Sequence, residues 1–216
     1  MSEHSPSSKQ GNKSPTVFVV DDDESMRNAL SNLLRSAGIQ VETFASTAEF
    51  LQQPKGDNAS CLVLDVRLQG ASGLEFQRQL TSTNSSIPII FITGHGDIEM
   101  SVKAMKAGAV DFLAKPFREQ DLLDAVSAAL QTDVKRREVE HQFADLHGHY
   151  QTLTVREKEV MALAVKGLMN KQIAGQMNLS EITVKIHRGH AMKKMNAKSF
   201  ADLVRMAEAL GERLDH

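Results

Sequence analysis

The stretch that decides the fold is Cys61-Leu62-Val63-Leu64-Asp65, four apolar residues followed at once by a carboxylate. A short apolar run between polar residues is typical of a strand that is buried on both faces in a parallel sheet. Asp65 then stands at the carboxyl end of that strand, where open α/β sheets keep their functional groups. Taken by itself, the fragment fits equally well an aspartate that only caps the next turn. The rest of the chain has to decide between these two interpretations.

Four other apolar runs have the same character, and helical patterns separate them. The runs cover residues 17–20, 41–44, 87–92 and 109–113. The helical patterns cover residues 24–37, 47–52, 74–80, 97–106, with Asp97 as the cap, and 119–130. Strands that alternate with helices are joined by right-handed crossovers into a parallel sheet covered on both faces. We therefore predict a five-stranded, doubly wound α/β domain in the first part of the chain.

Composition places the chain among ordinary proteins of two small domains, with average apolar and charged content over 216 residues. No apolar run is long enough to cross a bilayer, and residues 1–15 lack the apolar core of a signal peptide. We expect a cytoplasmic protein that makes no membrane contact, with residues 1–14 disordered. Cys61 is the only cysteine, so no internal disulfide can form, and we expect it to pack in a core.

The charge is distributed unevenly along the chain. Between positions 15 and 132, nine Lys and Arg residues stand against fifteen Asp and Glu residues, a net charge of −6. Between positions 150 and 216, eleven stand against seven, a net charge of +4. This asymmetry indicates a carboxylate-rich site in the first part and a polyanionic partner for the second.

Polar residues follow the predicted strands at one edge of the sheet. Because the carboxyl ends of parallel strands share an edge, the predicted sheet brings together Asp21, Asp22, Asp65, Thr93 and Lys115. Carboxylates that are close together repel one another unless a cation lies among them, and an all-oxygen site suits Mg²⁺ or Mn²⁺. A carboxylate nucleophile, a divalent metal, a lysine and a hydroxyl together can accept a phosphoryl group.

Four strings in this region resemble the receiver domain of two-component response regulators, and the FixJ-like receivers most of all. They are VVDDD (19–23), LVLDVRL (62–68), FITGHGD (91–97) and AMKAGAVDFLAKPF (104–117). The resemblance covers about residues 15–132 and implies a flavodoxin-like strand order of 2-1-3-4-5. It also implies that Asp65 is the phosphorylated residue. Asp22, Asp65 and the backbone carbonyl of Arg67 would then bind Mg²⁺ directly, and Asp21 would act mostly through water.

The resemblance also assigns roles to the later strand ends. Thr93 and Lys115 would contact the phosphoryl group, and Phe112 would be the aromatic switch, although a phenylalanine that only packs in the core fits the sequence as well. The bond between Lys115 and Pro116 would be cis. The loop after Asp65 departs from the family pattern, because Gln69 and Ala71 stand where proline and an apolar residue are usual. Phe112 is also a departure, since it lacks the hydroxyl of the usual tyrosine.

Residues 133–152 read as a helical linker. Val139, Phe143, Leu146 and Tyr150 form one apolar stripe of a helix. Four positions are too few to decide whether this stripe packs on the same chain or on a second copy. We expect His147 and His149 to be exposed linker residues rather than metal ligands.

Residues 153–216 read as four helices. Thr154 and Glu157 form a capping box for the first, the second covers 170–178, the third covers 181–195, and the fourth begins after Ser199. A short helix, a tight turn and a longer helix in a basic context are typical of a helix-turn-helix. We therefore predict an all-α domain of four helices that binds nucleic acid.

A helical wheel of residues 181–195 separates two faces. Val184, Ala191 and Met195 share the face that must be core. The opposite face carries Ile182, Lys185, Ile186, Gly189 and Lys193. Exposed isoleucines beside lysines suit thymine methyls and phosphates in a major groove, although a merely solvated basic face is the alternative interpretation. Arg188 falls toward the inner side, so only its long side chain could reach a phosphate.

The strings LTVREKEVMALAVKGLMNKQIA (153–174) and LSEITVKIHR (179–188) resemble the LuxR-type output domain of the same regulators, over about residues 150–213. The resemblance places Lys185, Ile186 and Gly189 in the groove and Lys171 on the backbone. Gly189 is a departure, because relatives often carry a larger side chain there. The full set of expected DNA-binding residues is Lys171, Thr183, Lys185, Ile186, Arg188, Gly189 and Lys193.

These features predict a transcriptional response regulator rather than an enzyme. Its domains would be residues 15–132 (receiver), 133–152 (linker) and 153–216 (LuxR-type helix-turn-helix). The expected partners are a sensor histidine kinase, promoter DNA, a second copy after phosphorylation and, for an activator, RNA polymerase. A Mg²⁺-dependent phosphohydrolase is disfavoured because Arg67 stands where a general acid would follow Asp65. A regulator that binds DNA regardless of phosphorylation remains an alternative.

Overall fold

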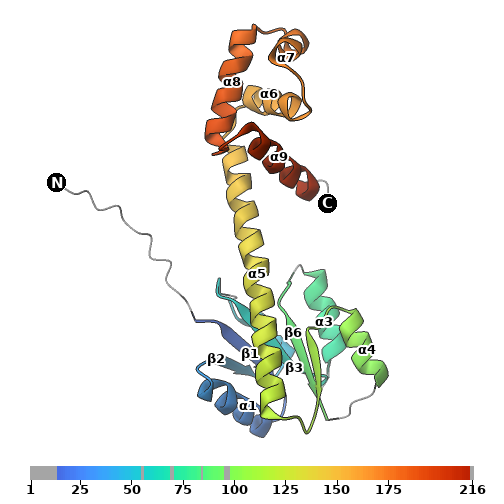
Figure 1. The fold of residues 1–216 in the computed structure, drawn as a ribbon. Coiled ribbons are helices and arrows are strands. Elements are labelled where there is room, and N and C mark those ends of the chain that lie inside the picture. Colours follow the sequence, from blue (N-terminus) through green and yellow to red (C-terminus); the bar gives the residue numbers. More distant parts are fainter. Residues whose placement is uncertain (1–13, 55, 69–70, 84, 95–97, 215–216) are drawn as a thin grey trace, which may run out of the picture. The chain divides into compact units, whose positions relative to one another are not determined.

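A computed structural model of the protein describes residues 14–54, 56–68, 71–83, 85–94 and 98–214 (Figure 1). The chain forms two compact units that divide between Arg137 and Glu138. Three expectations concern positions outside the described residues: the disorder of residues 1–14, of which only Ser14 is described, the effect of Gln69 on its loop, and the cap at Asp97.

The first unit holds a five-stranded parallel sheet, and its elements agree with the predicted α/β pattern. In chain order they are β1 (Thr16–Val20), α1 (Glu24–Ser36), β2 (Gln40–Phe44), α2 (Thr47–Gln52), β3 (Ser60–Asp65), β4 (Arg67–Leu68), β5 (Ala71–Ser72), α3 (Gly73–Ser82), β6 (Ile89–Thr93), α4 (Ile98–Lys106), β7 (Asp111–Ala114) and the beginning of α5 (Glu119–Gln151). The sheet order is β2-β1-β3-β6-β7, which confirms the predicted 2-1-3-4-5 order of its five strands. The small antiparallel pair β4–β5 was not predicted.

The sheet is buried on both faces because successive side chains of each strand pack in opposite directions. In β1, Phe18 and Val20 pack in a cluster with residues of α2, α3 and α4, whereas Val17 and Val19 pack in a cluster with residues of α1 and α5. Every residue of β3 is buried, which confirms the interpretation of the apolar run before Asp65. The two layers of helices therefore close both faces and leave the strand ends available for function.

Helix α5 corrects one prediction, since it does not end near Leu130 but continues to Gln151. Residues 119–147 contain neither glycine nor proline, so nothing in the sequence stops the helix. Its apolar positions change partners along its length. Leu122 and Val126 pack on the sheet, whereas Phe143 and Leu146 pack in the core of the second unit. Because the apolar face changes along the helix, the sequence pattern predicted two separate helical segments where the structure has one.

The second unit consists of the end of α5 and four shorter helices. These are α6 (Val155–Val165), α7 (Asn170–Met177), α8 (Glu181–Lys194) and α9 (Phe200–Leu214). Both halves of the capping box between Thr154 and Glu157 are present at the start of α6. Helix α7 is followed by its C-cap, Asn178, which has a left-handed backbone conformation with φ of 55°. This sharp turn leads directly into α8 and forms the predicted helix-turn-helix.

The linker stripe packs within its own chain. Phe143, Leu146 and Tyr150 join the core of the second unit, while Val139 is 47% exposed. His149 is exposed as expected, but His147 is half-buried because its ring stacks on Phe143 at 6.1 Å between centroids. Among the described residues, no helix has the length and apolar character needed to span a membrane.

Candidate functional site

The carboxyl edge of the sheet gathers polar side chains from four strands. Asp21 follows β1, Asp65 ends β3, Thr93 ends β6 and Lys115 follows β7. The register pairs Asp65 with the residue before Thr93, and Thr93 with the residue before Lys115, so the three positions lie side by side. The peptide bond before Pro116 is cis, as the resemblance implied.

Lys115 joins the two buried carboxylates of this edge. Its Nζ lies 2.7 Å from Asp65 Oδ2 and 3.0 Å from Asp21 Oδ2. The other oxygen of Asp65 accepts a 2.8 Å hydrogen bond from the backbone N–H of Arg67, and that of Asp21 accepts one of 2.9 Å from Asp23. Asp21 is 1% exposed and Asp65 is 7% exposed, so the site is shielded but Asp65 keeps limited access to solvent.

The electrostatics of the site favour additional positive charge. Burial raises the pKa of Asp21 above its ordinary value, although hydrogen bonds from Asp23 and Lys115 act in the opposite direction. Burial lowers the pKa of Lys115, but its hydrogen bonds to Asp65 and Asp21 outweigh this effect and raise the pKa. The lysine therefore stays protonated, and its single charge does not fully compensate the buried carboxylate pair.

The predicted metal ligands are only partly gathered. Within the part of the chain that the structure describes, no three His, Cys, Asp or Glu side chains form a cluster suited to a metal ion. Asp21 and Asp65 share one cation, whereas Asp22 is half-buried and Arg67 is exposed. The donor chemistry still fits a small divalent cation, because the buried side chains of Asp21 and Asp65 offer carboxylate oxygens and, among the described residues, only Lys115 bridges them.

Two residues that support this site were missed by the sequence reasoning. Arg27 of α1 donates from Nη1 to the backbone carbonyls of Asp21 at 2.8 Å and Asp22 at 3.0 Å, so it holds the acidic loop in place. Gly73 opens α3, and a Cβ there would lie 2.6 Å from the carbonyl oxygen of Asp65. A basic residue one turn after the acidic run was the available signal for Arg27. Nothing in the sequence pattern marked Gly73.

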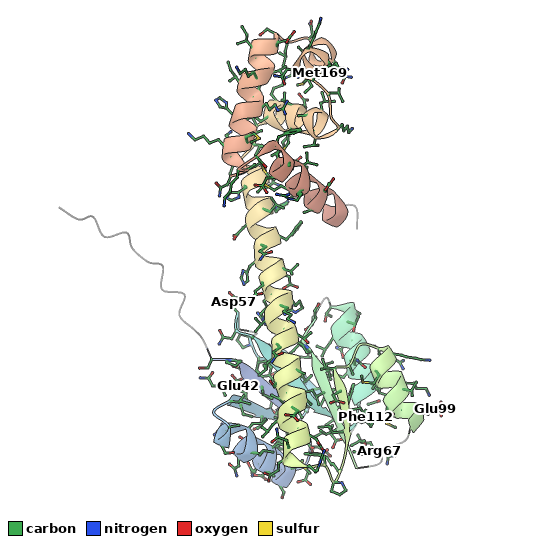
Figure 2. All side chains as sticks on the ribbon, viewed as in Figure 1. Glu42, Asp57, Arg67, Glu99, Phe112 and Met169 are labelled. Atoms are coloured by element: carbon green, nitrogen blue, oxygen red, sulfur yellow. The ribbon has the colours of Figure 1, made fainter. Side chains whose placement is uncertain are left out.

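Phe112 lies in β7 beside the site and is half-buried against the α2–α4 side of the core (Figure 2). Its ring lies 6.4 Å from that of Phe91 between centroids, in a tilted arrangement. This partial burial is compatible with both interpretations, a core phenylalanine and a switch.

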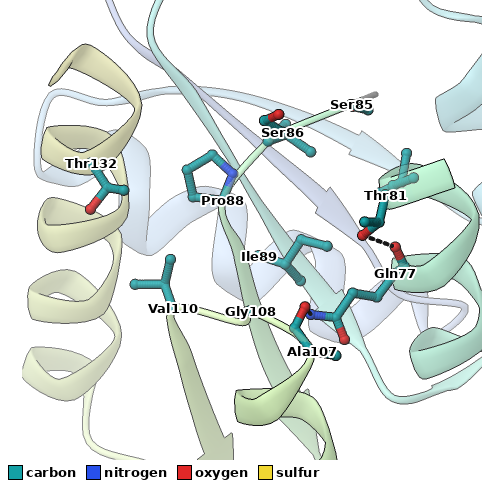
Figure 3. A pocket seen from close by; sticks show the side chains of 12 residues that line it. Gln77, Thr81, Ser85, Ser86, Pro88, Ile89, Ala107, Gly108, Val110 and Thr132 are labelled. Carbon is teal, nitrogen blue, oxygen red and sulfur yellow. Dashed lines mark hydrogen bonds between the residues drawn. The ribbon is translucent and has the colours of Figure 1, made fainter. Parts of the chain in front are cut away.

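A pocket of about 390 Å³ lies away from these residues, at the start of β6 (Figure 3). Its walls come from α3, from α5 and from the segment between α4 and β7. The lining residues include Gln77, Pro88, Gly108 and Thr132. All of its lining residues are uncharged, and none belongs to the predicted site. The pocket therefore lacks the charged groups that would hold a metal or a phosphoryl group.

The second unit presents the predicted recognition face on α8. Val184, Ala191 and Met195 are fully buried, which confirms the inner face of the wheel. On the other side, Ile182 is 73% exposed and Ile186 is 51% exposed. The remaining members of this outer face, all exposed, are Lys185, Gly189 and Lys193. Lys171 is exposed on α7, so it too is available to a partner.

Two other predicted DNA-binding residues have partners within the unit. Arg188 lies over the ring of Phe200 at 4.2 Å and donates to Asn170 Oδ1 at 3.2 Å. This position agrees with the expected inward direction. The hydroxyl of Thr183 lies 2.8 Å from that of Ser180, whose Oγ also accepts the Thr183 N–H as the cap of α8. Both side chains thus support the helix-turn-helix from within.

Comparisons with known proteins agree with this architecture. Residues 17–127 match the response regulator receiver domain, and residues 151–207 match the bacterial regulatory proteins of the luxR family. Nodulation protein W of Bradyrhizobium diazoefficiens is 60% identical over 200 residues, or 93% of this chain and 88% of that protein. Transcriptional regulatory protein FixJ of the same organism is 38% identical, over 90% of this chain and 95% of that protein.

A solved structure leads to the same class. The low-resolution structure of the response regulator StyR matches with a TM-score of 0.82 and 52% identity, over 91% of this chain and 99% of that one. The chain therefore belongs to the response regulators of two-component systems. Within them it is a transcription regulator that joins a receiver domain to a LuxR-type DNA-binding domain.

Proposed function

We propose that phosphorylation of Asp65 by a sensor histidine kinase switches this regulator. The observation that carries the proposal is the contact of Asp65 with Lys115 at 2.7 Å, which leaves a buried carboxylate beside a fixed cation at the edge of the sheet. A carboxylate oxygen of Asp65 would form a bond to phosphorus as the phosphorus–nitrogen bond of a phosphohistidine breaks. The electron pair of the broken bond stays on the ring nitrogen, and the ring leaves as neutral imidazole because its other nitrogen already carries a proton. Lys115 neutralises part of the charge that arrives.

The proposed site also requires Mg²⁺ or Mn²⁺. Asp21, Asp22, Asp65 and the backbone carbonyl of Arg67 would hold the ion. When bound, it would offset the negative charge of the incoming phosphoryl group. The lysine bridge supports this assignment, because Lys115 supplies one positive charge to two buried carboxylates and an added cation would offset the second. Arg27 would keep the acidic loop in position from the side of α1.

The switch that we propose runs from the phosphoryl group to the surface of α4 and β7. Thr93 would contact a phosphoryl oxygen, and Phe112 would fill the space that the threonine side chain leaves. Two apolar side chains on α4, Val102 at 44% and Met105 at 46% exposure, support a role for this surface in pairing with a second copy. Phosphorylation would therefore favour a homodimer.

The output that we propose is binding to promoter DNA in the cytoplasm. Lys185, Ile186, Gly189 and Lys193 would face the major groove, while Lys171, Thr183 and Arg188 would contact or support contacts to the backbone. RNA polymerase would be a further partner if the protein activates transcription. In this proposal residues 15–132 form the receiver, residues 133–152 the linker and residues 153–216 the DNA-binding domain.

One experiment tests the switch. DNA binding is measured with and without beryllium fluoride, a mimic of the phosphoryl group, and labelling by acetyl phosphate is measured with and without Mg²⁺. We expect tighter DNA binding with the mimic, Mg²⁺-dependent labelling, and loss of both in Asp65→Asn. Stoichiometric labelling of that variant would overturn the site. Equal DNA binding in both states would favour a phosphorylation-independent regulator, and rapid turnover of small phosphate esters would favour an enzyme.

A further inference from the structure

Helix α5 carries a fully buried carboxylate that the proposed phosphorylation site does not use. Asp133 is 0% exposed. Its Oδ2 accepts hydrogen bonds from the backbone N–H of Ser60 at 2.8 Å and from Arg137 Nε at 2.6 Å. Its Oδ1 accepts from Arg136 Nε at 2.9 Å and Nη2 at 2.6 Å. We call Asp133, Arg136, Arg137 and Ser60 the Asp133 latch.

The latch joins α5 to the strand that bears the phosphorylation site. Ser60 is the first residue of β3, and Asp65 is the last. Arg137 strengthens the connection, because it lies 3.5 Å from Ser60 Oγ and 3.6 Å from Asp57 in the loop before the strand (Figure 2). One end of β3 therefore carries Asp65, and the other end is tied directly to α5.

Polar bonds rather than apolar packing hold this part of the helix. Before the latch, Leu122, Val126 and Ala129 are buried in the sheet core. Around and after it, Val134 is 42% and Val139 is 47% exposed. Apolar side chains can slide against one another, so apolar packing alone would allow several positions of the helix on the sheet. Hydrogen bonds to a buried carboxylate are directional and fix one position. Buried charges of this kind specify geometry more than they add stability. The latch thus sets how α5 leaves the first unit.

The latch also lies at the end of the part of α5 that belongs to the first unit. The boundary between the two units follows Arg137, and two later residues of the helix, Phe143 and Leu146, pack in the core of the second unit. No glycine or proline lies between the latch and these residues, so the intervening helix is continuous. One helix therefore runs from the latch into the second unit.

We propose that Asp133 is a positioning residue that couples the receiver to the DNA-binding domain through α5. This inference rests on the proposed phosphorylation switch. Without the latch, phosphorylation of Asp65 would still occur, but its effect on DNA binding would be lost because the helix would no longer follow the sheet.

The test uses the full chain and the variant Asp133→Asn, which keeps the side-chain size but removes the charge. The matched control is Asp124→Asn, an exposed aspartate of the same helix that accepts a 2.8 Å hydrogen bond from Gln120. Three quantities are measured: labelling by acetyl phosphate, hydrogen exchange of residues 131–141 (α5), and the ratio of DNA affinities with and without beryllium fluoride. We expect Asp133→Asn to label like wild type, to exchange faster in this segment, and to have an affinity ratio close to one. Asp124→Asn should match wild type in all three.

The outcomes separate this inference from the switch itself. If wild type shows no response to beryllium fluoride, the phosphorylation switch is overturned, and the coupling role falls with it. If wild type responds and Asp133→Asn responds equally, only the coupling role of the latch is overturned. Should Asp133→Asn fail to fold, Arg137→Ala is the second variant, because it removes one donor and leaves the Arg136 pair. An Arg137→Ala protein with normal labelling and a full DNA response also overturns the inference.

Discussion

Asp21 is a buried carboxylate that lowers the stability of its own domain. Burial raises its pKa, so at neutral pH the fold holds a carboxylate where the neutral form is favoured. We therefore expect Asp21→Asn to raise the free energy of unfolding by about 0.5–2 kcal/mol at pH 7 in the presence of a chelator. Since the folded pKa lies above the unfolded value near 3.8, the gain should shrink as the pH falls through the folded pKa and vanish below 3.8.

The matched control for this prediction is Asp23→Asn. Asp23 is exposed and caps α1, and asparagine is an equally good cap. This variant removes the same charge from the same acidic loop without relieving a buried group. Urea unfolding of both variants at pH 7 and pH 3.5 distinguishes the two effects. An equal gain in Asp23→Asn would show that repulsion among the acidic residues, rather than burial of Asp21, limits stability.

Lysines on the two helices of the helix-turn-helix should contribute differently to DNA binding. Lys185 lies in the first half of α8, where such helices contact bases. Lys185→Ala should therefore weaken binding to the preferred site by about 1–3 kcal/mol and reduce the difference in affinity between that site and random DNA. Lys171→Ala should weaken binding to both DNAs alike and reduce the salt slope by about one unit. Salt titrations with both DNAs provide the measurement. If Lys185→Ala distinguished the preferred site from random DNA as well as wild type does, the assignment of the recognition face would be wrong.

At the level of single residues, sequence reasoning succeeded where topology alone sets position. The proximity of Asp65 and Lys115 could be predicted because the carboxyl ends of parallel strands lie at one edge of the sheet, independently of side-chain conformation. Asp22 was expected beside them, yet adjacent residues at a strand end point in different directions, and it is half-buried with no place in the lysine bridge. Gly73 could not be predicted, because its role depends on the close approach of the Asp65 carbonyl oxygen, 2.6 Å from where a Cβ would lie, which only the folded chain creates.

Among the elements, α6 and α8 are joined by an ion pair whose carboxylate is buried and whose lysine is 36% exposed. Glu157 is 3% exposed, and its Oε2 accepts from Lys194 Nζ at 2.6 Å and from the Thr154 N–H at 2.8 Å. Although burial acts to raise the pKa of Glu157, these hydrogen bonds lower it to about 2. The contribution to stability is therefore present above pH 4.5 and is lost as the pH falls from 4.5 toward 2.

We expect Glu157→Gln to lower the unfolding free energy of the second unit by about 1–3 kcal/mol at pH 7, and this loss should disappear near pH 2. Glu159→Gln is the control, because Glu159 is 45% exposed and its pair with Arg156 lies at the surface, where ion pairs contribute little. Tyr150 is the only tyrosine in a chain without tryptophan, so its fluorescence follows this unit. A loss of the same size in both variants would contradict the importance of burial.

Most helices and strands were predicted correctly, but α5 was not, because it packs against two different cores. The positions and types of the main strands and helices followed from apolar period and from caps such as Thr154 and Ser180. Helix α5 was predicted as two separate helical segments, because its apolar residues up to Ala129 pack on the sheet and those from Phe143 onward pack in the core of the second unit. Asp133 gave no signal, because its partner Ser60 lies 73 residues away in the sequence and only the folded chain brings the two together.

The whole molecule has separate cores in its two units, and each contains one natural reporter. Cys61 is fully buried in the sheet, and burial, together with the charge of Asp133, raises the pKa of its thiol to about 12. A chromogenic disulfide reagent should therefore react only when the first unit unfolds. We expect Asp21→Asn to shift only the thiol transition and Glu157→Gln only the Tyr150 transition. Coincident shifts of both reporters would show that the units unfold as one.

The final prediction concerns assembly of two copies. If α4 pairs the receivers after phosphorylation, a charge at Met105 should prevent it, because Met105 is 46% exposed and a pairing surface would remove it from water. Val139 on α5 is 47% exposed and provides a control of equal accessibility on a different surface. We expect Met105→Glu to be labelled like wild type but to remain monomeric with beryllium fluoride, whereas Val139→Glu dimerises.

DNA binding extends this test to the operator. A twofold dimer presents two α8 helices, so the preferred site should be an inverted repeat with half-sites about 10 base pairs apart. Met105→Glu should then lose affinity for the repeat and keep the wild-type affinity for a single half-site. Sedimentation and titration with both DNAs supply the measurements. A monomeric Val139→Glu beside a dimeric Met105→Glu would move the interface to the linker helix, since only contact through α5 could bury Val139 and leave α4 free.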